Sequence, residues 1–129
     1  MSLVDKVVLI TGAGRPNGIG AGIARCFANE GAKVVITDLE GAPLDETAVA
    51  IAGRVTGMVA DAAHQRSMAR AAERVLALHG RLDVLVSNAG IGGEQTPEDI
   101  GHLAVFYASA KARMIAGQVA AVDGGISVT

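Results

Sequence analysis

A glycine-rich segment at residues 11–20 constrains the fold of this chain more than any other feature. It follows an apolar run at 7–10 and leads into apolar residues at helical spacing, among them Ile23 and Phe27. Glycines between a strand and a helix let the backbone approach an anion, and the first N–H groups of the helix have no intrahelical partner. The segment therefore predicts a pyrophosphate site at a strand-to-helix turn. The residues expected to form it are Gly12, Gly18, Ile19 and Gly20.

An acidic residue follows the second apolar run. Residues 33–37 are apolar or β-branched after Lys33, and Asp38 comes directly after them. A carboxylate at the end of a second strand can accept hydrogen bonds from an adenosine ribose, and its charge repels a 2′-phosphate. Together with the glycine-rich segment, Asp38 predicts a nicotinamide dinucleotide as the cofactor, with NAD favoured over NADP.

Five short apolar runs recur along the chain and are continuous rather than alternating. Continuous runs are typical of parallel strands that are covered on both faces, and patterns with helical spacing separate these five. We therefore expect an α/β fold, a doubly wound, Rossmann-like parallel sheet of about five strands in the order 3-2-1-4-5. The last run is expected to pair with the fourth. The runs are 4–10, 33–37, 55–60, 82–87 and 118–122, and the helical patterns are 19–27, 42–52, 68–79 and 97–116.

Composition and charge exclude several classes of protein. The chain has 129 residues, which suits one domain, with a cofactor-binding half at 1–90 and a C-terminal helix and strand at 96–129. A net charge of −2 without a basic cluster argues against nucleic acid as a partner. No apolar stretch reaches the ~18 residues of a membrane span, so no membrane contact is expected. The single cysteine and the lack of a signal peptide favour a cytoplasmic protein. The cysteine and histidines lack ligand spacing, so no metal site is expected.

Several motifs, taken in order, resemble the short-chain dehydrogenase/reductase family. Thr11-Gly12 followed by Gly18-Ile19-Gly20 is similar to the family's glycine-rich loop, with two extra residues between the glycine groups. Asp38 matches its NAD-favouring acidic residue, and residues 87–90 resemble its Asn-Asn-Ala-Gly motif. Residues 96–125 are similar to its C-terminal helix and last strand. The resemblance implies hydride transfer between nicotinamide and a small carbonyl or alcohol substrate, and possible homo-oligomers. It also implies cofactor contacts by Asp61, Asn88, Ala89 and Gly90.

The resemblance breaks between Gly90 and Thr96. Family members carry their fifth and sixth strands there, with the catalytic serine and the Tyr-x-x-x-Lys pair. Either this chain has lost the segment, or its sequence joins two parts of a longer protein. Two functions stay open as a result: an active oxidoreductase, or a non-catalytic NAD-binding or interaction module that keeps the fold.

Tyr107 and Lys111 fit the Tyr-x-x-x-Lys pattern. Residues four apart share one face of a helix, so a lysine ammonium could lower the pKa of the tyrosine and help it act as a general acid. Residues 103–122, however, resemble the family's C-terminal helix and strand. In that alignment Tyr107 occupies a core position and Lys111 is a surface residue. The catalytic interpretation stays open, and the structural one is favoured.

Overall fold

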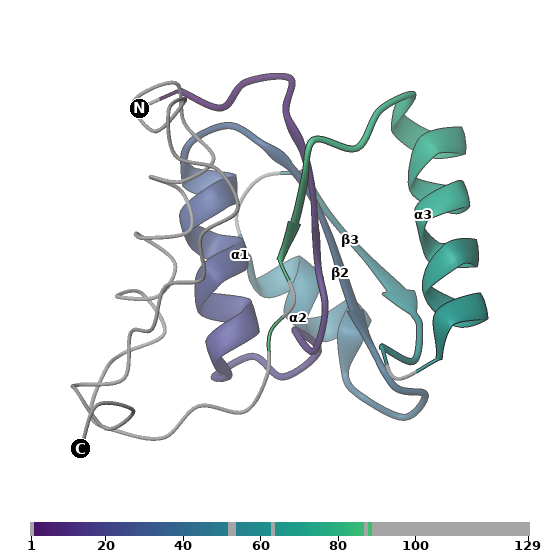
Figure 1. Ribbon diagram of the computed structural model, residues 1–129. Helices are drawn as coiled ribbons and strands as arrows, with labels where there is room; N and C mark the ends of the chain where they lie inside the picture. The colour runs from purple at the N-terminus through teal and green to yellow at the C-terminus, as the bar shows by residue number, and fades with distance from the viewer. Residues whose placement is uncertain (1, 52–53, 63, 87, 89–129) are drawn as a thin grey trace, which may run out of the picture.

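The computed structural model describes residues 2–51, 54–62, 64–86 and 88. Its four strands are all parallel and lie in the order β3-β2-β1-β4, which confirms the order expected for the first four strands (Figure 1). The predicted fifth strand at 118–122 lies outside the described residues. The strands are β1 (Val7–Ile10), β2 (Lys33–Asp38), β3 (Arg54–Val59) and β4 (Val84–Val86), and the helices are α1 (Ile19–Asn29), α2 (Leu44–Ala50) and α3 (Gln65–His79).

The helices cover both faces of the sheet, with α1 and α2 on one side and α3 on the other (Figure 1). Alternate residues of β1 explain this arrangement, since successive side chains of a strand point to opposite faces. Val8 and Ile10 pack in the cluster that contains Phe27 of α1, whereas Val7 and Leu9 pack in the cluster that contains Val75 of α3. β1 is therefore apolar throughout, as its continuous run predicts.

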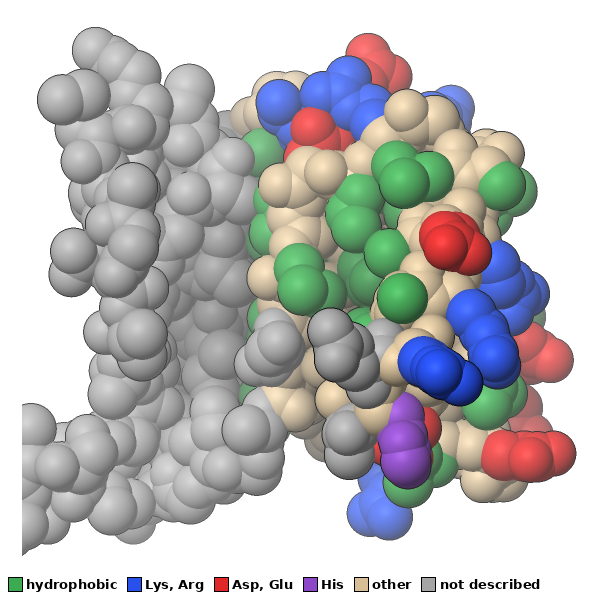
Figure 2. Space-filling view, turned by 45° about the vertical axis from the view of Figure 1, so that its right-hand side comes forward, with side chains coloured by type: hydrophobic (Ala, Val, Ile, Leu, Met, Phe, Trp, Pro, Cys, Tyr) green, Lys and Arg blue, Asp and Glu red, His purple; other side chains and the backbone are tan. Residues whose placement is uncertain are grey.

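Burial on both faces is confirmed for β1 and β2 and is wrong for β3 and β4. Every residue of β1 is buried, whereas Val59 of β3 is 55% exposed and Leu85 of β4 is 56% exposed. Both strands lie at an edge of the described sheet, where fewer elements reach them. Figure 2 turns the α3 side of the molecule toward the viewer. On that side, hydrophobic side chains lie grouped among charged ones.

Several predicted boundaries shift for local reasons. The first apolar run starts at residue 4, but β1 starts at Val7, because Asp5 has a φ of 70° and interrupts the extended chain. The predicted helix 42–52 shortens to α2, which begins directly after Pro43. In α3, Val75 is buried as expected, whereas Leu76 is 49% exposed because it lies one residue off the buried stripe.

Asp83, which directly precedes β4, joins this strand to the start of β1 through hydrogen bonds. Asp83 Oδ2 accepts the backbone N–H of Val7 at 2.9 Å, and the Asp83 N–H donates to the Val7 carbonyl at 2.9 Å. Arg81 forms an ion pair with the same carboxylate. Its Nε donates to Oδ2 at 2.9 Å, and a terminal nitrogen donates to Oδ1 at 2.7 Å. The hydrogen bond from Arg81 is the main cause that lowers the pKa of Asp83, and the Val7 N–H adds to it.

No helix within the described part of the chain is both long and apolar enough to cross a bilayer.

Candidate functional site

Those predicted site residues that the structure describes lie where the parallel strands end. The β1–α1 loop and the ends of β2 and β4 meet there through hydrogen bonds from three consecutive loop residues. The carbonyl of Gly12 accepts from Asn88, the N–H of Ala13 donates to the Thr37 carbonyl, and the N–H of Gly14 donates to Asp38. The carboxyl edge of an open α/β sheet is the usual place for a ligand in this architecture.

Within the described residues, no side chain of the N-cap position caps the first turn of α1. Its N-cap is Gly18, which makes no side-chain capping bond, and the first turn contains no acidic residue. Helices with such an N-terminus keep unpaired backbone donors and a positive dipole end, which together attract an anion. Gly18 itself donates its N–H to the Arg15 carbonyl at 3.1 Å, which closes the loop before the helix.

Gly20 lets α1 pack directly on the loop. A Cβ added at this position would lie 2.7 Å from the Cα of Ala13 and 2.8 Å from the carbonyl oxygen of Gly12. Both atoms belong to the backbone, so neither can move without shifting the loop. A glycine at this position is therefore required for the close contact between the helix and the glycine-rich turn.

Asn88 and Thr11 connect the loop to the end of β4. The Asn88 side-chain amide donates to the Gly12 carbonyl at 3.1 Å, and the Asn88 backbone N–H donates to the Thr11 hydroxyl at 3.2 Å. The Thr11 backbone N–H donates to the Val86 carbonyl at 3.1 Å. Gly12 has a φ of 65°, which favours glycine, so the turn can carry its carbonyl to Asn88 without strain.

Asp38 is oriented by two backbone donors. Its Oδ2 accepts the N–H of Gly14 at 3.0 Å, and its Oδ1 accepts the N–H of Leu39 at 2.8 Å. A carboxylate has about four acceptor positions, so each oxygen keeps one for a further donor. The carboxylate is therefore held in place and can still accept hydroxyl groups.

Asp61 lies in the turn between β3 and α3. Its side chain is 38% exposed, and Oδ2 lies 3.5 Å from Nε2 of His64. Its backbone N–H donates to the Ser67 hydroxyl at 2.8 Å. The structure thus places Asp61 at the carboxyl edge of the sheet, two residues after β3 ends. Among the described residues, no group of three or more histidine, cysteine, aspartate or glutamate side chains is arranged to hold a metal ion.

Thr47 of α2 belongs to the site, although its sequence position did not indicate this. Its buried hydroxyl donates to the Gly14 carbonyl at 2.8 Å across 33 residues of sequence. Thr47 and Gly14 meet only because α2 packs against the loop. A threonine within a short helical pattern does not by itself predict such a contact. The predicted residues Ala89, Gly90, Tyr107 and Lys111 lie outside the described residues.

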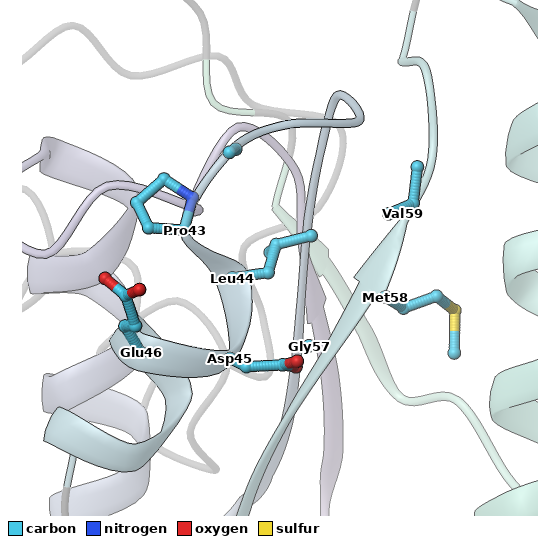
Figure 3. A pocket seen from close by; sticks show the side chains of 8 residues that line it. Pro43, Leu44, Asp45, Glu46, Gly57, Met58 and Val59 are labelled. Atoms are coloured by element: carbon cyan, nitrogen blue, oxygen red, sulfur yellow. The ribbon is translucent and has the colours of Figure 1, made fainter.

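A cavity of about 270 Å³ lies beside this site, between the start of α2 and β3 (Figure 3). Leu44 and Asp45 point toward β3, whereas the side chain of Glu46 points away from it. None of the predicted cofactor residues lines the cavity. Its two charged lining residues, Asp45 and Glu46, are both acidic, which disfavours a phosphate there. The candidate anion site is therefore the α1 N-terminus and not this cavity.

The strand order and the glycine-rich turn define a Rossmann-like α/β protein. The chain belongs to the short-chain dehydrogenase family, whose model matches residues 6–116. It is 44% identical over 91 residues to a Mycobacterium tuberculosis protein described as probable oxidoreductase EphD, a match that covers 68% of this chain and 15% of that protein.

Two solved structures are similar in both sequence and fold. The 3-ketoacyl-(acyl-carrier-protein) reductase from Brucella melitensis, solved with NADH, has 43% identity and a TM-score of 0.62, and covers 72% of this chain and 38% of its own. The Pseudomonas aeruginosa RhlG/NADP active-site complex has 33% identity and a TM-score of 0.61, and covers 69% of this chain and 36% of its own. The chain thus matches between 15% and 38% of the length of these three proteins.

Proposed function

We propose that this chain binds a nicotinamide adenine dinucleotide at the carboxyl edge of its sheet, as the cofactor-binding part of an oxidoreductase that acts on a carbonyl or alcohol group. The observation that carries the proposal is the uncapped N-terminus of α1, which lies against the glycine-rich loop. Membership of the short-chain dehydrogenase family supports it, as do the complexes of two similar proteins, one with NADH and one with NADP.

The pyrophosphate is proposed to bind the free N–H groups of the first turn of α1. Gly18, Ile19 and Gly20 begin that turn and bring only one side chain, that of Ile19, close to the anion. Gly12 and Asn88 fix the loop that faces it, through their 3.1 Å hydrogen bond. Ala89 and Gly90, which follow Asn88, are proposed to continue the binding surface toward the nicotinamide, as the family resemblance implies.

The adenosine ribose is proposed to bind Asp38. Both carboxylate oxygens are already anchored by backbone N–H groups, so their remaining acceptor positions face a ligand in a fixed direction. A 2′-phosphate at the same place brings like charges together, and this favours NAD over NADP. Asp61, in the turn after the neighbouring strand, is proposed to contact the adenine.

The bound cofactor supplies the hydride, and the protein positions it and provides a proton donor or acceptor. Tyr107 is the only tyrosine in the sequence. Lys111, four residues later, is the only charged residue three or four positions from it. A tyrosine of this chain that acts as the proton donor must therefore be Tyr107. The second candidate function, a non-catalytic NAD-binding or interaction module, is favoured by the absence of the family's central segment between Gly90 and Thr96 in this sequence.

The central test is the Asp38→Ala variant in calorimetric titrations with NAD⁺ and with NADP⁺. Loss of one charged hydrogen-bonding partner is expected to weaken NAD⁺ binding by about tenfold or more, which corresponds to about 1.4 kcal/mol. NADP⁺ binding is expected to change less or to strengthen, because the repulsive charge is gone. Equal losses for the two cofactors would contradict the assignment of Asp38 to the ribose.

A second experiment separates the two candidate functions. Oxidation of NADH is followed with a panel of ketones, next to direct binding of NAD⁺ to the same preparation. Turnover that disappears in the folded Tyr107→Phe variant assigns the proton donor to this residue. Binding without turnover for any ketone favours the non-catalytic module.

A further inference from the structure

Thr47 makes a buried hydrogen bond to the loop that holds Asp38. Its side chain is fully buried, at 0% exposure, and its hydroxyl donates to the Gly14 carbonyl at 2.8 Å. The other end of the same residue, the Gly14 N–H, donates to Asp38 Oδ2 at 3.0 Å. One glycine therefore connects helix α2 to the carboxylate proposed to bind the ribose.

The contact leaves little freedom at Gly14. A Cβ added there would lie 2.7 Å from the Cβ of Asp38 and 3.0 Å from the Cβ of Ala42. The loop backbone thus lies directly against Asp38, on one side, and against the chain leading into α2, on the other. Movement of Gly14 displaces both its carbonyl, which Thr47 contacts, and its N–H, which orients the carboxylate.

Glycine by itself does not hold a loop in one conformation, because it has the largest backbone freedom of all residues. The fixed carbonyl must therefore come from its partner. A buried carbonyl that loses its donor is costly, so the Thr47 hydroxyl selects the conformation in which the N–H of Gly14 faces Asp38.

We propose that Thr47 is a positioning residue of the dinucleotide site, which orients Asp38 through Gly14 and so sets the affinity for the adenosine ribose. This inference rests on the proposed function in one respect, that Asp38 accepts the ribose hydroxyl groups. The residue itself touches no cofactor.

The variants Thr47→Val and Thr47→Ser test the hydroxyl. Valine keeps the shape and removes the donor, and is expected to weaken NAD⁺ binding by about tenfold, the effect of losing one well-formed hydrogen bond. Serine keeps the donor and is expected to stay within about twofold of the parent. If Thr47→Val does not fold, Thr47→Ala removes the same hydroxyl without adding a methyl group, and the same loss is expected.

Thr56→Val is the control for the same chemical change. Thr56 is an exposed residue of β3 and makes none of the contacts described for the site. NAD⁺ affinity is expected to stay within about twofold of the parent, because surface substitutions away from a site have small effects.

A double-mutant cycle with Asp38→Ala separates positioning from general stabilisation. If Thr47 acts through Asp38, Thr47→Val changes NAD⁺ affinity by less than about twofold once the carboxylate is absent. A loss of the same size in both backgrounds overturns the proposal.

Amide hydrogen exchange gives a readout that needs no cofactor. Thr47→Val is expected to accelerate exchange of the Gly14 amide by about tenfold relative to that of Ala13, whose N–H donates to Thr37 instead. If the parent chain binds no NAD⁺ but Thr47→Val still accelerates exchange at Gly14 selectively, the proposed function is contradicted. The contact between Thr47 and Gly14 is then still supported. Strong NAD⁺ binding without any response to Thr47→Val contradicts the positioning role alone.

Discussion

At Gly20 the first helix and the glycine-rich loop touch through their backbones. A methyl group at this position would approach the Ala13 Cα to 2.7 Å, so the helix must move away from the loop. The proposed roles of Gly12 and Asp38 can be predicted from the sequence, because a phosphate-binding turn and a ribose acceptor have local sequence patterns. The bond from Thr47 to Gly14 was not, since it depends on how α2 packs against the loop.

The variant Gly20→Ala is predicted to lose both stability and cofactor affinity. Overpacking of this kind costs about 1–3 kcal/mol in the free energy of unfolding, and the displaced helix N-terminus is expected to weaken NAD⁺ binding by about tenfold or more. Urea denaturation and calorimetric titration measure the two effects. Unchanged NAD⁺ affinity in a destabilised Gly20→Ala protein would show that this contact does not shape the site.

Gly80→Ala serves as the control for Gly20→Ala. Gly80 ends α3 with a φ of 76°, and a Cβ there meets nothing within 4 Å. Alanine in this left-handed conformation costs about 1 kcal/mol through backbone strain alone. Stability is expected to fall while NAD⁺ affinity stays the same, since Gly80 lies at the opposite end of α3 from Asp61.

Among the elements, α1 is the one whose sequence pattern and structure agree most closely. Ile23 and Phe27 were expected on its buried face, and both are at most 1% exposed. At the start of α1, Gly18 provides no side-chain cap. In β3 and β4 the sequence predicted burial on both faces, and Val59 and Leu85 are more than half exposed. A continuous apolar run does not reveal whether its strand lies at the centre or the edge of the sheet.

Capping α1 is predicted to stabilise the fold and to weaken cofactor binding. Gly18 has extended dihedral angles, and a Cβ there would lie 3.4 Å from the Arg15 carbonyl oxygen, an ordinary contact. Aspartate in Gly18→Asp can cap the free N–H groups and complement the dipole, for a gain of about 0.5–1 kcal/mol. The same carboxylate competes with the pyrophosphate, so NAD⁺ affinity is expected to fall by about tenfold or more. A higher melting temperature with full NAD⁺ affinity would place the phosphates elsewhere.

The pairing of β4 with β1 is predicted to weaken in acid. Because the hydrogen bond from Arg81 lowers the pKa of Asp83, the charged form stabilises the fold above the ordinary aspartate pKa of about 3.9. That contribution is lost as the pH falls through the lowered pKa of the folded protein. Asp83→Asn keeps an acceptor for the Val7 N–H and removes the charge. The variant is expected to be less stable than the parent near neutral pH and equally stable in strong acid, by urea denaturation. A stability difference that stays constant with pH would contradict this role.

At the scale of the whole molecule, the topology followed from the order of apolar runs and glycine-rich turns. Parallel strands require crossover helices, and right-handed crossovers leave few arrangements for four strands. The order β3-β2-β1-β4 is the expected one. The assignment of residues 1–129 to one domain, and of 118–122 to a fifth strand beside β4, stay predictions.

Hydrogen exchange tests the fifth strand. If residues 118–122 pair with β4, the amides of 119–122 are expected to exchange at least about a hundredfold more slowly than unprotected amides, because ladder bonds in a sheet open only with a larger unit. The amide of Gly41, in an exposed turn, provides the fast reference. Rapid exchange throughout 119–122 in the folded protein would refute the pairing.

Calorimetric titration of the folded chain with the oxidised dinucleotide is the decisive test of the proposed cofactor site. We expect a single saturable binding event for NAD⁺, at least about tenfold tighter than for NADP⁺. No heat up to millimolar NAD⁺, with folding verified by circular dichroism on the same sample, would contradict it.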